Sequence, residues 1–135
     1  MKMIKRTLLL TLAFASTSFL FQSCSKVEGP GGSSSIVGKI HINVYDVAGH
    51  LINDYDAPDE DVYLIYGEEG TFYDDDVKTS YDGSFEFNYL QKGKYRLFVY
   101  QDCNTCASGK EAVFVDVEIT DKKTTTDVGT INIVD

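Results

Sequence analysis

Apolar and polar residues alternate with a period of two from Ile36 to the end of the chain. In the segment GKIHINVY, Ile40, Ile42 and Val44 fall on one side and the polar residues between them on the other. This period is typical of half-buried β-strands, and no segment has a convincing helical period. Seven such segments are separated by turn sequences: one begins at Ile36, and the others cover 61–68, 75–81, 84–89, 94–101, 113–119 and 124–134. The pattern predicts an all-β fold, a two-sheet antiparallel β-sandwich of seven strands.

Two local signals refine this prediction. Asp82-Gly83 stands between the third and fourth segments and is typical of a tight hairpin turn, which needs positive φ angles. Gly129 interrupts the alternation of the last segment. We expect a β-bulge at Gly129 that restores the register of that strand.

Residues 79–99 carry a longer pattern, TSYDGSFEFNYLQKGKYRLFV. It resembles the T-x-x-D-G-x-F-x-F-x-x-L-x-x-G-x-Y-x-L-x-V pattern of carboxypeptidase-regulatory-like domains, which are of the transthyretin-like (prealbumin-like) and CnaB sandwich type. The resemblance implies a seven-stranded antiparallel Greek-key β-sandwich over residues 36–135. It also implies an accessory, stalk or binding role, such as these domains have at the front of outer-membrane nutrient transporters. A fold by itself does not supply a function.

The N-terminus predicts export from the cytoplasm. Lys2, Lys5 and Arg6 form a basic start, and the run from Thr7 to Phe21 is apolar with a few hydroxyls. This arrangement is typical of a secretory signal peptide. The run is shorter than the roughly 20 apolar residues of a membrane-spanning helix. We therefore interpret residues 1–23 as a signal peptide.

The residues that follow predict a lipid anchor. Phe21-Gln22-Ser23-Cys24 resembles the lipobox of Bacteroidota-type bacterial lipoproteins, which implies cleavage before Cys24 and acylation of this new N-terminal cysteine, for example with palmitate. Ordinary signal-peptidase cleavage is the alternative. Several acyl chains give stable anchoring, and Ser25 after the cysteine favours the outer membrane, with either leaflet open. Residues 24–35 then form the lipidated cysteine and a Gly/Ser-rich flexible tether.

The charge of the exported chain narrows the choice of partners. Three of the twelve Lys and Arg residues, and none of the twenty-one Asp and Glu residues, precede Cys24. The remainder has nine basic and twenty-one acidic residues, a net charge of −12. Such a surface repels phosphate backbones, so we expect no nucleic-acid partner.

No sequence motif indicates catalysis. His41 alternates with core positions and should point outward, and His50 lies in a turn-like Gly49-His50 pair. The chain has no metalloprotease motif, nucleophile elbow or phosphate-binding loop. Acid–base catalysis by its many carboxylates would need a concave pocket. We expect a protein without enzymatic activity and without a cofactor.

Acidic residues between the first two predicted strands allow one alternative, a calcium site. Asp54, Asp56, Asp59 and Asp61 stand in a Pro-containing loop and offer the hard oxygen ligands that calcium prefers. Their spacing does not match the EF-hand loop. Solvated loops that keep a neighbouring strand edge unpaired explain the same residues.

Aromatic residues are the candidates for partner binding. The chain has nine Tyr and eight Phe, and Phe98, Tyr100 and Phe114 fall on predicted outward faces. Exposed aromatic rings anchor protein partners or stack on sugars. The absence of Trp weakens the interpretation as a glycan-binding protein. Cross-strand pairing on a solvent face explains these residues equally well.

The two remaining cysteines, Cys103 and Cys106, predict a disulfide. They form an even pair in an exported chain once Cys24 is acylated. A redox motif would open a helix, and a zinc site would need two more ligands.

Together, these features predict an outer-membrane-anchored lipoprotein, a non-enzymatic accessory or binding module of the cell envelope. Its expected partner is an envelope protein such as a nutrient-uptake complex. A calcium-dependent or glycan-binding surface module is the alternative.

Overall fold

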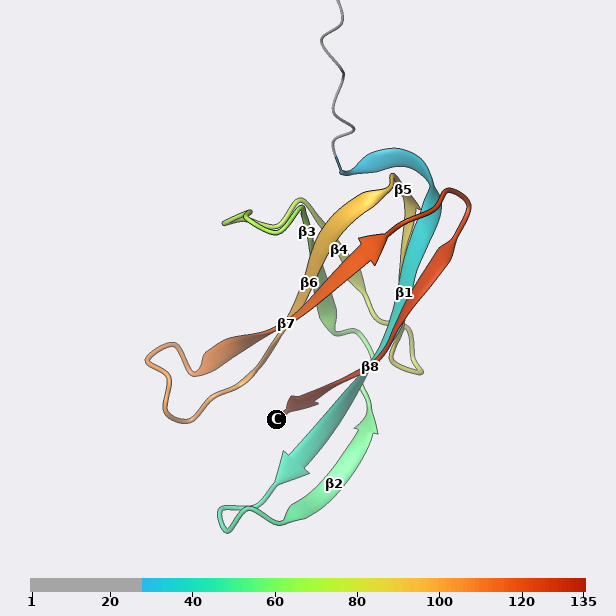
Figure 1. Cartoon of the computed structure of the whole chain (residues 1–135). Coiled ribbons are helices and arrows are strands. Elements are labelled where there is room, and N and C mark those ends of the chain that lie inside the picture. The colour runs from blue at the N-terminus through green and yellow to red at the C-terminus, as the bar shows by residue number, and fades with distance from the viewer. Residues whose placement is uncertain (1–27) are drawn as a thin grey trace, which may run out of the picture.

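The computed structural model describes residues 28–135, which form eight β-strands in two facing sheets (Figure 1). The predicted signal peptide and Cys24 lie outside the described residues. Within residues 28–135, no helix is long and apolar enough to cross a membrane. The strands are β1 (Pro30–Tyr45), β2 (Leu51–Asp56), β3 (Asp61–Tyr66), β4 (Asp75–Lys78), β5 (Ser84–Leu90), β6 (Gly93–Asp102), β7 (Lys110–Ile119) and β8 (Thr125–Val134).

One sheet has the order β4-β3-β6-β7 and is antiparallel throughout. The other is built around β1, which pairs with β5 over its first part and with β2 over its last part. β8 pairs with β1 along the opposite edge. The hairpin of β1 and β2 extends beyond the rest of the sandwich (Figure 1).

The hydrophobic core lies between the two sheets. Its largest fully buried side chain is that of Tyr95, whose hydroxyl accepts a hydrogen bond from the backbone N–H of Gly29 (3.0 Å) and donates one to the carbonyl of Gln91 (2.8 Å). Burial of the ring is therefore achieved without an unpaired hydroxyl. The other members are apolar residues of both sheets: Ile36, Ile40, Ile42, Ala57, Val62, Leu64, Phe85, Phe87, Leu90, Leu97, Val99, Ile119, Ile131 and Ile133.

The prediction of an all-β, two-sheet sandwich is confirmed, and the prediction of seven strands is wrong. The additional strand is β2, which occupies part of the segment interpreted as an acidic loop. Five of its six residues are exposed, because β2 pairs with β1 in the protruding hairpin and covers little of the core. A strand without a buried face lacks the alternation by which the others are recognised.

The prediction that all strands are antiparallel is also wrong, because β8 runs parallel to β1. β7 lies in the other sheet, and the β7–β8 loop returns the chain to the end where β1 begins, with the Ser35 N–H donating to the carbonyl of Thr124. The bulge at Gly129 is confirmed. Its φ is 74°, and the β1–β8 register shifts at this point, after which Ile131 and Ile133 face the core.

Asp82-Gly83 forms a turn, but not the predicted hairpin within one sheet. The Gly83 N–H donates to the carbonyl of Ser80 (2.9 Å), and the φ of Gly83 is 76°. β4 ends at Lys78 and β5 belongs to the other sheet, so the turn carries the chain across the sandwich. The Gly83 carbonyl also accepts a hydrogen bond from the Ile40 N–H on β1 (2.9 Å).

The predicted tether is wrong for residues 30–35, which form the start of β1. Gly32 lies so close to β5 that a Cβ atom there would sit 1.8 Å from the carbonyl oxygen of Leu90. Ser34 and Ser35 are buried, and the Ser34 hydroxyl donates to the carbonyl of Asp121 (2.9 Å). Small residues are common in flexible linkers, but they also allow a strand to lie close to its neighbours. In this chain they form such a strand.

Candidate functional site

Five aromatic side chains gather on the outer surface of the β4-β3-β6-β7 sheet. Along β6, Leu97 and Val99 point into the core, so Phe98 and Tyr100 point outward. Phe98 lies opposite Tyr63 of β3 on one side and opposite Phe114 of β7 on the other. We call the cluster the aromatic face, and its members are Tyr63, Tyr73, Phe98, Tyr100 and Phe114.

The rings of the aromatic face pack against one another. Phe98 stacks on Tyr63 with a centroid separation of 4.8 Å and contacts Phe114 at 5.6 Å. Tyr73, from the β3–β4 loop, packs on Tyr63 at 4.8 Å, and Tyr100 contacts Phe98 edge-on at 5.5 Å. Cross-strand aromatic pairs of this kind stabilise a sheet. Cross-strand pairing therefore explains why Tyr63 and Phe98, the inner rings, lie on the outer surface of the sheet.

The outer rings retain a large accessible area. Tyr73, Tyr100 and Phe114 are 51%, 45% and 56% exposed, respectively. Phe98, predicted to face solvent, is only 8% exposed because its neighbours cover it. The face therefore has a buried centre and a half-exposed periphery. Exposed apolar side chains that lie together, rather than singly, mark interaction surfaces.

Arg96 borders the aromatic face and is held in place. Its Nε donates to Asp116 Oδ1 at 2.5 Å, Nη2 to Oδ2 at 3.2 Å, and Nη1 to the carbonyl of Glu68 at 2.9 Å. The guanidinium carbon lies 5.8 Å from the centroid of Phe114, within cation–π range. The hydrogen bond from Arg96 lowers the pKa of Asp116, so this carboxylate stays charged. Aromatic residues and Arg are the types enriched in protein interfaces.

An open groove of about 610 Å³ adjoins the aromatic face near the end of β6. Tyr63 and Tyr100 form its aromatic part, and Glu60 is its half-buried carboxylate. Burial raises the pKa of Glu60, and within residues 28–135 its carboxylate makes no side-chain hydrogen bond or ion pair. The remaining lining residues are Asp61, Ser108 and Lys110. The groove thus combines two tyrosine rings with donors and acceptors of hydrogen bonds.

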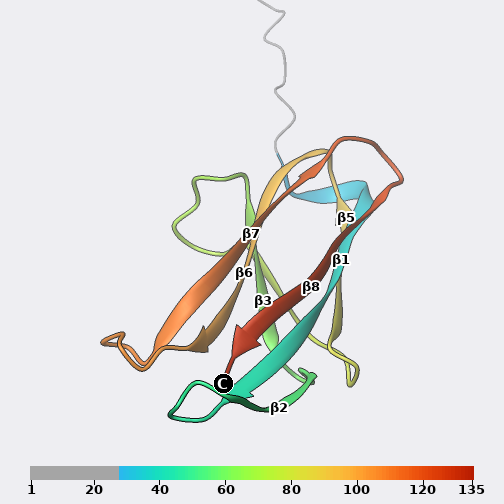
Figure 2. The ribbon, with the colours of Figure 1, turned by 60° about the horizontal axis from the view of Figure 1, so that its bottom comes forward.

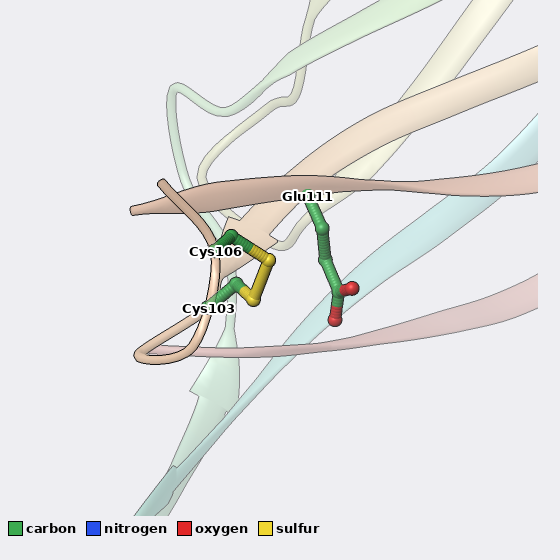
Figure 3. A group of neighbouring side chains, drawn as sticks. All are labelled: Cys103, Cys106 and Glu111. Atoms are coloured by element: carbon green, nitrogen blue, oxygen red, sulfur yellow. A yellow bond between two sulfur atoms is a disulfide. The ribbon is translucent and has the colours of Figure 1, made fainter. Parts of the chain in front are cut away.

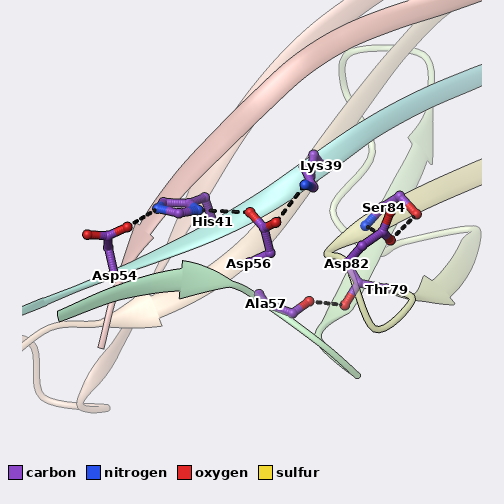
Figure 4. Close-up of polar contacts among 8 residues, drawn as sticks. All are labelled: Lys39, His41, Asp54, Asp56, Ala57, Thr79, Asp82 and Ser84. Carbon is purple, nitrogen blue, oxygen red and sulfur yellow. Dashed lines mark hydrogen bonds and ion pairs between the residues drawn. The ribbon is translucent and has the colours of Figure 1, made fainter.

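The aspartates considered as calcium ligands lie in two groups, each engaged by cations. Asp56 accepts from Lys39 Nζ at 2.6 Å and lies 3.0 Å from His41 Nδ1, while Asp54 lies 3.2 Å from His41 Nε2 (Figure 4). Asp59 and Asp61 face Lys78 instead.

Asp59 and Asp61 form the second group, around Lys78. The Lys78 Nζ atom is 3.0 Å from Asp61 and 3.6 Å from Asp59. In the described part of the chain, no three of the four aspartates converge within 4.8 Å, as a shared metal ion would require. Asp54 and Asp56 stand on β2, whereas Asp59 lies in the β2–β3 connection and Asp61 begins β3. The sequence pattern did not predict β2, and this strand places the two groups apart.

The Cys103–Cys106 disulfide is confirmed, with Cα atoms 5.3 Å apart (Figure 3). Its loop is closed by backbone hydrogen bonds, including one from Cys103 N–H to the carbonyl of Gly109 (2.9 Å). Glu111 lies beside the two sulfur atoms. Both thiols are consumed by the disulfide, so this trio is not a metal site in the oxidised protein.

The sequence pattern predicts Phe98, Tyr100 and Phe114 as partner-binding residues, and all three lie together in the structure. It missed Tyr63, although this residue alternates with the buried Val62 and Leu64 and so could have been placed on the outer face. It also missed Tyr73 and Glu60, which come from loops or strand junctions where periodicity carries no information.

Comparisons with known proteins add little to this description. No protein-family model and no curated protein matches the chain. A solved structure of a Pseudomonas aeruginosa protein, proposed to bind carbohydrate, matches with a TM-score of 0.47 and 11% identity, over 79% of this chain and 91% of that one. At this similarity, the match supports no inference about family or ligand.

Proposed function

We propose that the chain is a non-enzymatic binding module of the bacterial cell envelope, a lipoprotein anchored to the outer membrane through Cys24. Its proposed ligand is another envelope protein, such as a component of a nutrient-uptake complex. The anchor rests on the lipobox-like Phe21-Gln22-Ser23-Cys24. The binding role rests on the aromatic face.

The half-exposed periphery of the aromatic face is the observation that carries the proposal. Tyr100, Phe114 and Tyr73 expose rigid rings around a packed centre, with Arg96 beside them. Aromatic side chains bury roughly 150–250 Å² each and dominate interface energetics. Because these rings are already held by their neighbours, this chain would lose little side-chain entropy when a partner binds them.

The surroundings of the face indicate the charge of the partner. Asp61, Asp76 and Asp116 lie on the outward side of β3, β4 and β7 around the rings, and the exported chain has a net charge of −12. Complementary charge at the rim of an interface raises association rates and excludes wrong partners. We therefore expect a partner surface with an apolar centre and a basic rim.

Co-purification tests the protein-binding role. The chain is extracted from membranes in mild detergent, either as wild type or with Tyr100→Ser and Phe114→Ser. A second double variant, Tyr81→Ser with Tyr89→Ser, removes two exposed tyrosines from outside the aromatic face and serves as the control. We expect a stoichiometric membrane-protein partner with wild type and control, and its loss with the first variant. Equal recovery with all three would contradict the proposal.

Glycan binding in the groove is the second candidate, because the groove places Tyr63 and Tyr100 beside Glu60 and Ser108. Tyrosine rings stack on sugars, and these polar groups match sugar hydroxyls. A glycan array with the wild-type chain and with Glu60→Gln distinguishes the candidates. Signal that falls with Glu60→Gln and survives Phe114→Ser supports a glycan in the groove. Partner loss with Phe114→Ser alone supports the protein interface.

A further inference from the structure

The sandwich begins very soon after the proposed lipid anchor. Cys24 and Pro30, the first residue of β1, are six residues apart. Six residues span at most about 20 Å when fully extended. If Cys24 is acylated, as the proposed function requires, the end of the sandwich where β1 begins lies within that distance of the lipid headgroups.

Three lysines lie at this same end. Lys92 is in the β5–β6 turn, and Lys122 and Lys123 are in the β7–β8 loop. Both connections lie at the top of Figure 1, beside the start of β1, and the view in Figure 2 agrees. The Lys123 N–H donates to the hydroxyl of Ser33 (3.2 Å), which ties the loop directly to the start of β1.

The lysines at this end differ from the other cations of the chain in their pairing. Of the eight Lys and Arg residues within 28–135, only Lys122 and Lys123 take part in no ion pair. Lys92 reaches Asp121 only at 4.0 Å. The other five each have a carboxylate partner: Lys39, Lys78, Lys94, Arg96 and Lys110.

Several carboxylates lie at this end, among them Glu118, which lies opposite Lys94, and Glu68, which pairs with Lys94. Asp121 lies in the β7–β8 loop, and Glu28 lies beside Gly93. Within residues 28–135 none of these carboxylates forms an ion pair with Lys122 or Lys123, so these two exposed side chains present unpaired positive charge beside the start of β1. Lys122 and Lys123 lie next to the anchor point and suit an anionic surface on that side, because a lysine near anionic lipid contributes about fivefold to binding.

We infer that the end of the sandwich formed by the start of β1, the β5–β6 turn and the β7–β8 loop docks on the anionic headgroups of the membrane that holds Cys24. This inference rests on the proposed lipid anchor. Docking orients the molecule: β6 starts at this end and runs away from it for ten residues, or about 33 Å. The groove beside Tyr100 and Lys110 then faces away from the membrane, where a partner can reach it.

Lysine acetylation in vesicles tests the inference. The full chain is purified in detergent from membranes of cells that export it, and reconstituted in two kinds of vesicle. One is phosphatidylcholine alone, and in the other about a third of the lipid is phosphatidylglycerol. Sulfo-NHS-acetate then labels the lysines, and mass spectrometry measures the rate at each. We expect labelling of Lys122 and Lys123 to be at least about fivefold slower in the anionic vesicles, and that of Lys39 and Lys78 to be equal in both.

Two further measurements make the test specific. Lys122→Gln with Lys123→Gln should abolish the protection of Lys92 in anionic vesicles, whereas Lys78→Gln with Lys110→Gln, an equal change of charge elsewhere, should preserve it. At about 1 M NaCl, where the screening length falls to about 3 Å, all protection should disappear.

The two hypotheses fail in different ways. A chain that floats with neutral vesicles, but whose Lys122 and Lys123 react equally in both vesicle types, overturns the docking and leaves the anchor intact. A chain that does not float with neutral vesicles overturns the anchor, and the docking with it. Protection that persists at high salt overturns the electrostatic docking.

Discussion

His41 on β1 lies directly opposite Asp56 on β2, with its imidazole Nδ1 3.0 Å from a carboxylate oxygen of Asp56. The other ring nitrogen, Nε2, is 3.2 Å from Asp54. β2 contributes almost nothing to the core, so it is held by its backbone pairing with β1 and by side-chain contacts such as these. The hydrogen bond with Asp56, followed by that with Asp54, raises the pKa of His41 above its ordinary value.

This arrangement predicts a pH-dependent stability. The unfolded His41 has a pKa of about 6.5, and its folded pKa is higher. The stabilisation is therefore complete below about pH 6.5 and is lost as the pH rises through the folded pKa. We expect the Tm of the wild type to fall relative to His41→Gln over this interval, in scans at a series of pH values. Parallel curves for wild type and His41→Gln would contradict the prediction.

The strands that build the core were predictable because their burial is visible in the sequence. In β6, Tyr95, Leu97 and Val99 alternate with outward residues, and the predicted range 94–101 lies within the observed strand. β2 was not predictable in this way, because an exposed strand has no alternation. The pairing of β8 with β1 depends on contacts about ninety residues apart, which local pattern does not contain.

The candidate site was predictable only in part, for a related reason. Alternation placed Phe98 and Phe114 on outward faces, but it could not show that they lie opposite each other, because register between strands is a property of the assembled sheet. The disulfide was predictable by counting cysteines in an exported chain. The sequence Asp82-Gly83 predicts a turn, and the structure has one. It does not predict that the strands on either side belong to different sheets, because packing of the whole domain decides this.

Gly32→Ala should be strongly destabilising, which tests whether the Gly/Ser-rich segment belongs to the sandwich. A Cβ atom at this position would meet backbone atoms of Leu90 at 1.8 and 2.1 Å, so β1 and β5 would have to separate. We expect a loss of more than about 2 kcal/mol, seen as a fall in Tm of about 10 °C or more. Gly49→Ala is the control: it has open space but a φ of +83°, and should cost about 1 kcal/mol. Equal effects would mean that residues 30–35 are not packed against β5.

Removal of the disulfide should weaken the β6–β7 loop without unfolding the protein. The ring closed by Cys103 and Cys106 is small, and backbone hydrogen bonds at Gly109 hold the same loop. We expect Cys103→Ser with Cys106→Ser to cost about 1–2 kcal/mol and to make the loop more sensitive to protease. Intact mass after alkylation, with and without reduction, checks the bond itself. Two alkylated thiols in the unreduced exported protein would refute the disulfide.

Cys24→Ala should release the protein from the membrane. Under the proposed lipid anchor, this residue alone carries the acyl chains, and lysine contacts without them are too weak for stable attachment. We expect the variant in the soluble fraction and without label from a palmitate analogue. Ser23→Ala keeps the cysteine and a small residue before it, and should remain anchored. Retention of Cys24→Ala in the membrane fraction would mean that the lipobox interpretation is wrong.

The hydroxyl group of Thr79 should be required for the stability of the fold. This requirement would give a physical reason for the threonine that begins the T-x-x-D-G pattern. Its side chain is 6% exposed. The Thr79 Oγ1 atom donates to the carbonyl of Ala57 (2.5 Å) and accepts from the Glu60 N–H (2.8 Å), so it links the end of β4 to the β2–β3 connection.

Thr79→Val keeps the shape and removes both hydrogen bonds, which leaves a buried donor and a buried acceptor unpaired. Such a change costs about 1–3 kcal/mol. Thr79→Ser keeps the hydroxyl and loses one methyl group, worth about 0.8 kcal/mol. In urea denaturation, we therefore expect Thr79→Val to be the less stable variant, with unchanged m-values for both. A Thr79→Val midpoint at or above that of Thr79→Ser would show that the methyl group, and not the hydroxyl, is what this position requires.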